Sequence, residues 1–168
     1  LLPLARARGH QVTLYFNQAP AEGAFAGATH EVIPFPRLWT HLRLGWALRR
    51  KPPDVFFTPA HVIPISYFGP SVATVHDLGY RIFPAAHTPF QLAYLNWSTL
   101  HNARRSRRVL ADSTTTRDDL VRFYHVSPQK IDVVYPGVDP ELAPVRDPQV
   151  LAAVQARYTI DGPYMLYL

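Results

Sequence analysis

A histidine and an aspartate directly follow a short apolar run, at a place where parallel sheets bind ligands. The run covers residues 72–75, and His76 and Asp77 come next. Ligands of open parallel sheets bind outside the carboxyl ends of the strands. An imidazole there could hydrogen-bond a hydroxyl or stabilise developing charge, and Asp77 could orient it or bind another hydroxyl. The plainer interpretation is a loop histidine that satisfies its own backbone neighbours.

A group of hydroxyl side chains stands in the same topological place after the predicted strand segment 109–112. Ser113 and Thr114 open this group, and a helical pattern begins with Thr114. Hydroxyls and free N–H groups at a helix start form a potential site for an anion or a sugar hydroxyl. An ordinary N-cap by Ser113 explains the same residues without any ligand.

A third candidate follows the predicted strand 131–135, which is closed by Pro136 and Gly137. Gly137 permits a positive φ angle or a close approach of the backbone to a ligand. Val138 and Asp139 come next, and the Asp139 carboxylate could bind a ligand directly. A simple turn is the alternative reading of the same segment.

Two arginine-rich segments could bind anions. Residues 104–108 carry the densest run of positive charge, although such runs more often form a solvated helix face. Residues 38–50 predict an amphipathic basic helix that could rest on an anionic membrane, the alternative being an ordinary surface helix. The residues that give this helix its character are Trp39, His41, Arg43, Trp46, Arg49 and Arg50.

Metal and cofactor chemistry receives no support from the sequence. The eight histidines show no spacing typical of a metal site, and the chain has no cysteine. Glycine-rich phosphate loops of the Walker or dinucleotide type are also missing from the sequence. We therefore expect neither a metal nor a bound cofactor.

Strand and helix patterns alternate along the chain, which predicts the elements that position these candidates. Strands are expected at 12–16, 31–35, 54–59, 71–77, 107–112, 131–135 and 164–168. Helices are expected at the start of the chain up to Gly9 and at 38–50, 89–105, 114–125 and 148–158. This alternation predicts an α/β fold with a doubly wound, mainly parallel, Rossmann-like sheet.

Two of these helices carry apolar or aromatic side chains at helical spacing. In the helix at 38–50 the spacing is shared by Leu38, Leu42, Gly45 and Trp46. In the helix at 89–105 the helical spacing predicts one face made of Phe90, Ala93, Tyr94, Trp97, Leu100 and His101.

Composition bounds the class of protein. The chain has 168 residues, of which 48% are hydrophobic, and this argues against disorder. No apolar stretch reaches the roughly 20 residues of a membrane-spanning helix. The net charge of +5 favours anionic partners without choosing among nucleotide phosphates, acidic membranes and nucleic acid. A cytoplasmic location is the default expectation, with peripheral contact to the inner membrane face left open.

Both ends of the sequence read as interior positions of a longer protein. A doubly wound unit begins with strand, turn and helix, whereas this chain opens inside a helical pattern. Its last five residues form a strand pattern with no following turn.

Three segments together resemble the amino-terminal domain of the group 1, family 4 glycosyltransferases, retaining enzymes with two Rossmann-like domains (the GT-B type). The order and spacing of the segments match that family, as does the opening segment at 8–13, and the ending at 163–168 is similar to the first strand of the family's second domain. The three segments are 74–78, 109–113 and 131–139.

The resemblance implies transfer of a sugar from a nucleotide-sugar donor to a sugar or glycolipid acceptor with retention of the anomeric configuration. It places His76 in the cleft near the transferred sugar, with Asp77 beside it. It assigns Ser113 and Thr114 to the start of a helix that faces the cleft. The stretch just before the domain linker corresponds to Gly137, Val138 and Asp139.

The resemblance also implies a division into domains. Residues 1–160 would form the amino-terminal, acceptor-side domain without its first strand, and residues 161–168 would begin the donor-side domain. That second domain carries the family's basic pair and the carboxylates that bind the nucleotide-sugar. We therefore expect the chain on its own to be inactive.

Two other functions remain open at this point. A non-catalytic Rossmann-like module that binds a sugar or nucleotide is the main alternative. Nucleic-acid binding through the arginine-rich stretches ranks below both, because the aromatics follow core periodicity and no recognised nucleic-acid fold is present. We therefore expect no nucleic-acid partner.

Overall fold

The structure is a computed structural model that describes residues 2–25, 27–35, 37–60, 62–139 and 142–166. The chain divides into two units, Leu1–Tyr135 and Pro136–Leu168, and each is described by itself.

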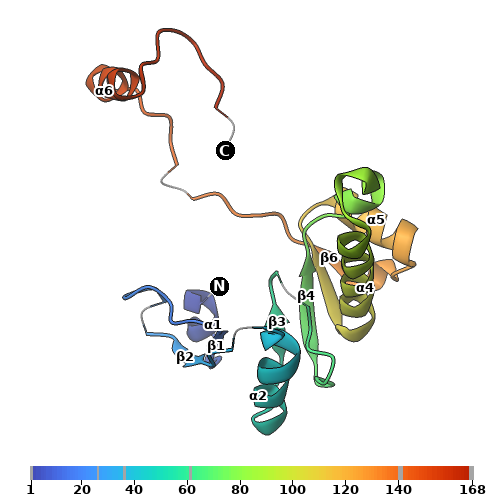
Figure 1. The fold of residues 1–168 in the computed structure, drawn as a ribbon. Coiled ribbons are helices and arrows are strands. Elements are labelled where there is room, and N and C mark those ends of the chain that lie inside the picture. Colours follow the sequence, from blue (N-terminus) through green and yellow to red (C-terminus); the bar gives the residue numbers. More distant parts are fainter. Residues whose placement is uncertain (1, 26, 36, 61, 140–141, 167–168) are drawn as a thin grey trace. The chain divides into compact units, whose positions relative to one another are not determined.

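A four-stranded parallel sheet forms the centre of the first unit (Figure 1). Its strands lie in the order β3-β4-β5-β6, so each neighbours the next one along the chain. This arrangement confirms the predicted α/β class with a parallel, Rossmann-like sheet. Because all four strands run the same way, their carboxyl ends share one edge. The strands are β3 (Phe56–Thr58), β4 (Ser71–Val75), β5 (Arg108–Ala111) and β6 (Ile131–Val133).

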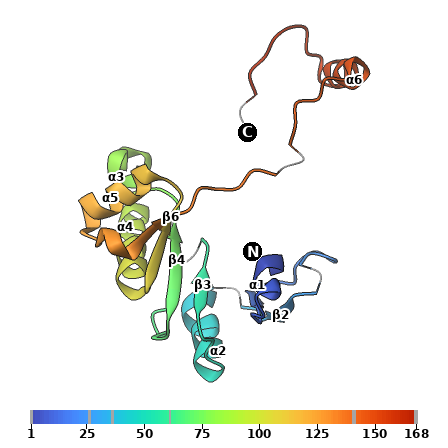
Figure 2. The same ribbon diagram turned by 180° about the vertical axis from the view of Figure 1, so that it is seen from behind.

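The helices α4 (Pro89–Arg105) and α5 (Thr114–Tyr124) cover one face of this sheet. Both views place them on the same side of β4 (Figures 1 and 2). Ala103 of α4 and Leu120 of α5 join the buried cluster of Val75, Val109 and Ala111. Side chains on the opposite face are only partly covered in the described residues, so burial alternates along the strands.

Helix α4 has the bounds that the sequence predicts, but it turns a different face to the core. Thr88 caps its start by accepting a hydrogen bond from the backbone N–H of Gln91. The aromatic face is largely exposed, whereas the buried face consists of short side chains. Short side chains let the helix lie close to the sheet, and their polar atoms find partners there. The buried residues are Ser98, Thr99, Asn102 and Ala103.

The predicted helix at 38–50 forms as two consecutive pieces. A π-helical turn, η1 (Thr40–Leu44), leads into α2 (Gly45–Arg50). Its buried face carries Leu44, Gly45 and Leu48, which pack towards Ile63, Tyr67 and Ala73. The row Leu38, Leu42 and Trp46 is exposed instead.

A separate two-stranded parallel sheet precedes these elements. Helix α1 (Leu2–Ala7) ends before Gly9, whose φ angle of +74° is a left-handed conformation that favours glycine. Strand β1 (Thr13–Phe16) pairs with β2 (Thr29–Val32), which starts two residues before the predicted strand at 31–35. Beyond β2, Ile33 still donates its backbone N–H to Phe16.

Short elements complete the first unit. Helix α3 (Gly79–Ile82) and the 3₁₀ turn η2 (Pro84–Ala86) follow β4, and the 3₁₀ turn η3 (Pro128–Lys130) precedes β6.

Among the described residues of the unit Pro136–Leu168, one helix forms, α6 (Pro148–Tyr158), and the Asp147 side chain caps it. Of the strand expected at 164–168, residues 164–166 are described and adopt no strand, while 167 and 168 lie outside the described residues. The domain boundary after residue 160 stays a prediction.

Candidate functional site

His76 and an aspartate from the neighbouring strand meet at the carboxyl edge of the sheet. Val75 and Ala111 are register partners of β4 and β5, so the next residues, His76 and Asp112, lie side by side. The His76 Nδ1 atom lies 2.6 Å from Asp112 Oδ2. Such a short distance is typical of a charge-assisted hydrogen bond.

The second ring nitrogen of His76 also faces an acceptor. Nε2 lies 2.8 Å from the carbonyl oxygen of Pro59, just beyond β3. A carboxylate and a carbonyl can only accept, so both ring nitrogens must carry protons to make both bonds. This geometry therefore favours the imidazolium form of His76.

The electrostatics agree with this protonation state. The hydrogen bond that His76 donates to Asp112 is the largest cause that raises the pKa of His76 above 6.5; burial opposes this shift, and the negative charge of Asp112 adds to it. A carboxylate at this distance stabilises the charged imidazole. The His76 side chain is 53% exposed, so a ligand from solvent can reach it.

The first turn of α5 fixes the backbone at His76. Ser113 accepts a hydrogen bond from the backbone N–H of Thr116 at 3.0 Å, which confirms the predicted N-cap. The Thr116 hydroxyl donates to the carbonyl oxygen of His76 at 2.9 Å. Thr116 is buried, so this bond ties the end of β4 to α5 away from solvent.

We predict that Thr116→Val destabilises the chain by about 1–3 kcal/mol, because it leaves the His76 carbonyl without its buried donor. Valine keeps the shape and β-branching of threonine, so helix propensity changes little. Denaturant unfolding measures the difference. Thr115→Val is the matched control, since Thr115 is exposed in the same turn. Equal destabilisation by the two variants would contradict the role given to Thr116.

Asp77 organises the loop that follows His76. Its Oδ1 atom accepts the backbone N–H of Gly79 at 2.7 Å, at the start of α3. The next residue of that helix, Tyr80, is buried, and its hydroxyl lies 2.8 Å from both Thr99 Oγ1 and Tyr124 Oη. Helix α3 is thereby attached to α4 and α5, which holds the loop in place.

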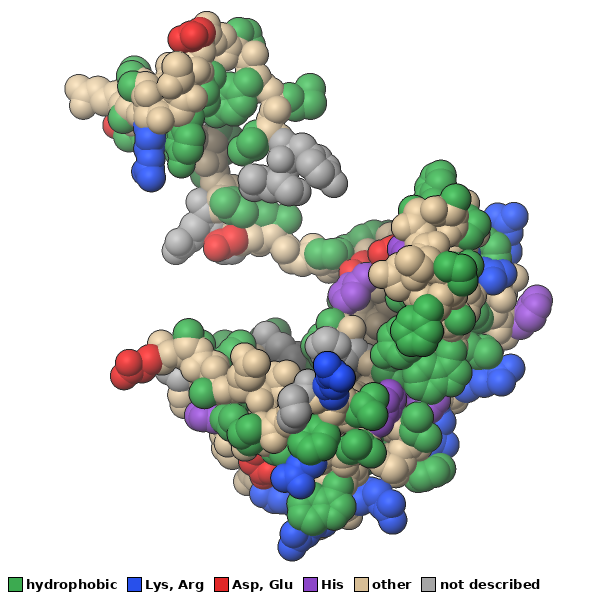
Figure 3. Space-filling model, viewed as in Figure 1, with side chains coloured by type: hydrophobic (Ala, Val, Ile, Leu, Met, Phe, Trp, Pro, Cys, Tyr) green, Lys and Arg blue, Asp and Glu red, His purple; other side chains and the backbone are tan. Residues whose placement is uncertain are grey.

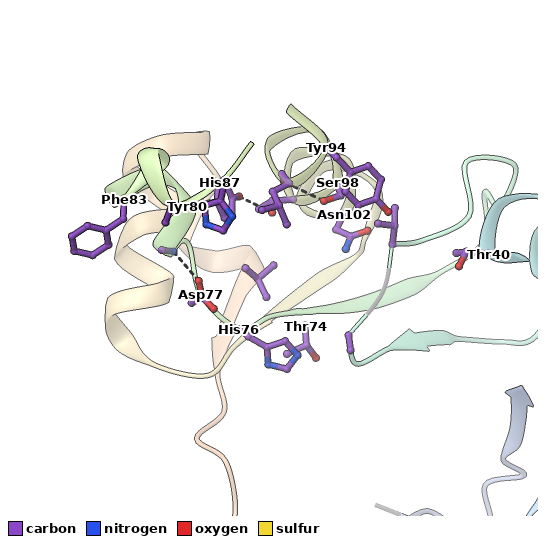
Figure 4. A pocket seen from close by; sticks show the side chains of 17 residues that line it. Thr40, Thr74, His76, Asp77, Tyr80, Phe83, His87, Tyr94, Ser98 and Asn102 are labelled. Atoms are coloured by element: carbon purple, nitrogen blue, oxygen red, sulfur yellow. Dashed lines mark hydrogen bonds between the residues drawn. The ribbon is translucent and has the colours of Figure 1, made fainter. Parts of the chain in front are cut away.

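A hollow of about 620 Å³ opens beside His76 and Asp77. Figure 4 shows Tyr94, Ser98 and Asn102 lining it from α4, opposite the end of β4. Its wall combines aromatic rings with hydroxyl and amide groups, a mixture suited to a small polar molecule with apolar faces. Other residues of the wall are Thr40, Thr74, Tyr80, Phe83 and His87.

The remaining predicted site residues lie in two places. Thr114 is exposed as the first residue of α5, one position beyond the cap. Gly137, Val138 and Asp139 belong to the second unit, whose position relative to His76 is not defined. The φ angle of Gly137 is not positive, and an added Cβ would meet no atom within 4 Å. A glycine is therefore not required there by the local backbone.

The sequence reading missed Asp112 as the partner of His76, and with it the contributions of Pro59 and Thr116. A usable signal was present for Asp112. Two apolar strands that neighbour each other in a parallel sheet both end in polar residues, so the residues just past their ends must be adjacent. The carbonyl of Pro59 left no such signal, because every residue carries one.

The described part of the chain offers neither a cluster of metal ligands nor a helix able to span a membrane. Residues 2–25, 27–35, 37–60, 62–139 and 142–166 contain no group of three or more potential metal-ligating side chains. Among the same residues, no helix has the length and apolar character needed to span a bilayer. The cytoplasmic location stays a prediction.

Comparison with known proteins identifies a family and solved structures with a similar fold. The model of the family described as Glycosyltransferase Family 4 matches residues 2–142. The structure is similar to a glycosyltransferase from Rickettsia africae ESF-5, with a TM-score of 0.55 and 15% sequence identity. The similarity covers 95% of this chain and 44% of that one, so the chain spans less than half of its solved relative. No curated protein sequence matches the chain.

Proposed function

Because the chain belongs to glycosyltransferase family 4, we propose that it supplies the acceptor-side half of an enzyme that moves a sugar from a nucleotide-sugar to an acceptor. The anomeric configuration is retained in this reaction. The C1–oxygen bond to the donor diphosphate breaks, and a bond forms between C1 and the acceptor oxygen. The proton of the acceptor hydroxyl leaves with the diphosphate.

The observation that carries this proposal is the His76 imidazole beside the hollow, with Nδ1 2.6 Å from the Asp112 carboxylate and Nε2 2.8 Å from the Pro59 carbonyl oxygen. His76 presents an N–H donor on Nε2 and a positive charge, both fixed by Asp112. When Nε2 exchanges the Pro59 carbonyl for a sugar hydroxyl, the imidazolium holds the transferred sugar and stabilises charge that develops on its oxygens. Preorganised donors of this kind contribute strongly to catalysis because they need no reorganisation during the reaction.

The hollow beside His76 supports the placement of an acceptor. Its volume of about 620 Å³ lies in the range of small-molecule sites. The ring of Tyr94 offers an apolar surface for the C–H face of a sugar, and Ser98 and Asn102 lie on the same wall.

Roles for the other predicted residues follow from their places. We assign Asp77 and Thr114 to substrate binding, since both are exposed near the ends of β4 and β5. Ser113 contributes through its cap, which positions the first turn of α5. Gly137, Val138 and Asp139 keep the role implied by the family resemblance, next to the linker between domains.

We predict no turnover of UDP-glucose or GDP-mannose by the 168-residue chain alone, with monosaccharide and glycolipid acceptors. The longest reading frame that contains the chain is expected to turn over its donor, because the family's donor-binding groups lie in a second domain. Release of nucleoside diphosphate measures turnover, and the anomeric proton signal of the product reports its configuration.

Catalysis by the chain alone would contradict the proposal that the donor-binding groups lie in a second domain. An inverted product would contradict retention. If the longer protein binds nucleotide-sugars in a titration but catalyses no transfer to any acceptor, the binding-module alternative replaces the enzyme.

A further inference from the structure

The helical segment η1–α2 exposes an apolar row on the face away from the core. Leu44 and Leu48 are buried, whereas Leu38, Leu42 and Trp46 are exposed by 67%, 53% and 52%. These three residues are spaced four apart, so they form one line along the segment. We call them, with Arg43, Arg49 and Arg50, the basic strip.

Positive charge surrounds the apolar row without any acid in the segment. Residues 37–51 contain five Lys or Arg side chains and no Asp or Glu. The guanidinium carbons of Arg50 and Arg43 lie 4.7 Å and 5.7 Å from the centre of the Trp46 ring. Figure 3 shows Lys and Arg side chains around hydrophobic ones at the foot of the molecule, where Figure 1 places α2.

The backbone at Leu38, the first residue of the basic strip, adopts a strained conformation although the side chain of Leu38 is exposed. Leu38 has a φ angle of +56°, a left-handed conformation that is uncommon for residues other than glycine. The next residue is anchored, because the indole N–H of Trp39 donates to the carbonyl oxygen of Ile33 at 2.8 Å. Packing against the core does not explain the placement of Leu38, since its side chain is exposed.

A neighbouring loop, which packs against the buried side of the segment at Gly45, carries further exposed apolar side chains. The backbone N–H of Ile65 donates to Nδ1 of His41 in η1, so this loop adjoins the segment. The Ile65 and Phe68 side chains are exposed by 53% and 78%. Arg105 lies over the Phe68 ring, 4.2 Å from its centre, which repeats the pairing of a guanidinium with an exposed ring.

We propose that the basic strip forms a surface that docks onto an anionic lipid bilayer. Arginine guanidinium groups pair with lipid phosphates, while the leucine and tryptophan side chains enter the boundary between headgroups and acyl chains. A nucleic acid is disfavoured as the occupant, because the aliphatic side chains of Leu38 and Leu42 gain nothing from contact with its charged backbone. The proposal is independent of the sugar-transfer chemistry.

Flotation of the 168-residue chain with lipid vesicles tests the proposal. Vesicles of phosphatidylcholine and phosphatidylglycerol in equal parts are expected to capture the chain, and pure phosphatidylcholine vesicles to capture much less. Each basic residue near an anionic leaflet raises partitioning about fivefold, so Arg49→Glu with Arg50→Glu is expected to lower it about 25-fold or more. Leu42→Ser with Trp46→Ser is expected to lower it about tenfold at unchanged charge.

Two control variants separate the surface from net charge and general hydrophobicity. Arg122→Glu with Arg157→Glu makes the same charge change on α5 and α6, and Ile82→Ser removes an exposed apolar side chain of α3. Both controls are expected to bind within about twofold of the parent, since neither touches the strip. All variants change exposed side chains, and thermal unfolding checks that each is folded.

Loss of flotation by the control charge pair equal to that by Arg49→Glu with Arg50→Glu would overturn the proposal, since net charge alone would then explain binding. No flotation of the parent with anionic vesicles would also overturn it. Salt-sensitive binding of a single-stranded oligonucleotide, without capture by vesicles, would assign the strip to nucleic acid instead.

Discussion

The variant His76→Ala is expected to lower turnover by about 10²–10³-fold in the longest reading frame that contains this chain. The substitution removes both the donor on Nε2 and the positive charge beside the hollow. Thermal stability should change little, because the His76 side chain is half exposed and belongs to neither hydrophobic cluster. Steady-state kinetics and a thermal melt measure the two effects separately.

Two companion variants define what the histidine supplies. His76→Gln keeps an N–H donor without the charge, and it should remain at least about tenfold below the parent if the imidazolium is required. His10→Ala removes an exposed histidine that is far from His76 in the sequence, and it should leave turnover unchanged. Turnover of His76→Ala within a few fold of the parent would remove His76 from the site.

The variant Asp112→Asn is expected to move the alkaline fall in turnover to lower pH. Asp112 raises the pKa of His76, so the imidazolium persists to a higher pH than an unperturbed histidine allows. Turnover that needs this charge declines as the pH rises through the raised pKa. Asparagine can still accept a hydrogen bond from Nδ1 but carries no charge, so the decline in turnover begins at a lower pH.

The raised pKa of His76 also makes folding stability depend on pH, and in the same direction as turnover. A pKa that folding raises above the unfolded value gives stability at low pH, and this contribution is lost as the pH rises through the folded pKa. An NMR titration of the His76 ring in the 168-residue chain reads this pKa directly, without any substrate. Identical titration midpoints in the parent and in Asp112→Asn would contradict the role of Asp112, whatever the kinetics show.

The sequence predicted the sheet and the strand ends well, for a local reason. Short apolar runs bounded by polar or turn residues mark buried parallel strands, and His76 and Ser113 follow directly after such runs. The cap by Ser113 was equally visible, because a hydroxyl before a helical pattern has few other roles. These features depend on neighbours in the sequence.

Features that depend on packing between distant segments were not predictable in this way. The aromatic row of α4 resembles a core face, yet the helix buries Ser98, Thr99 and Asn102 because small side chains let it approach the sheet. In α2 the spacing of Leu38, Leu42 and Trp46 marks a face without saying which side of the helix meets the core. The partner of His76 required the register between β4 and β5, which single-strand patterns do not contain.

The bond between His76 Nε2 and the Pro59 carbonyl means that the binding group is already occupied by the chain itself. An incoming hydroxyl has to compete with this internal substitute, so the apparent dissociation constant equals the intrinsic one divided by the fraction of molecules whose nitrogen is free. In the proposed function, the peptide following β3 therefore weakens sugar binding, because it competes for the same ring N–H.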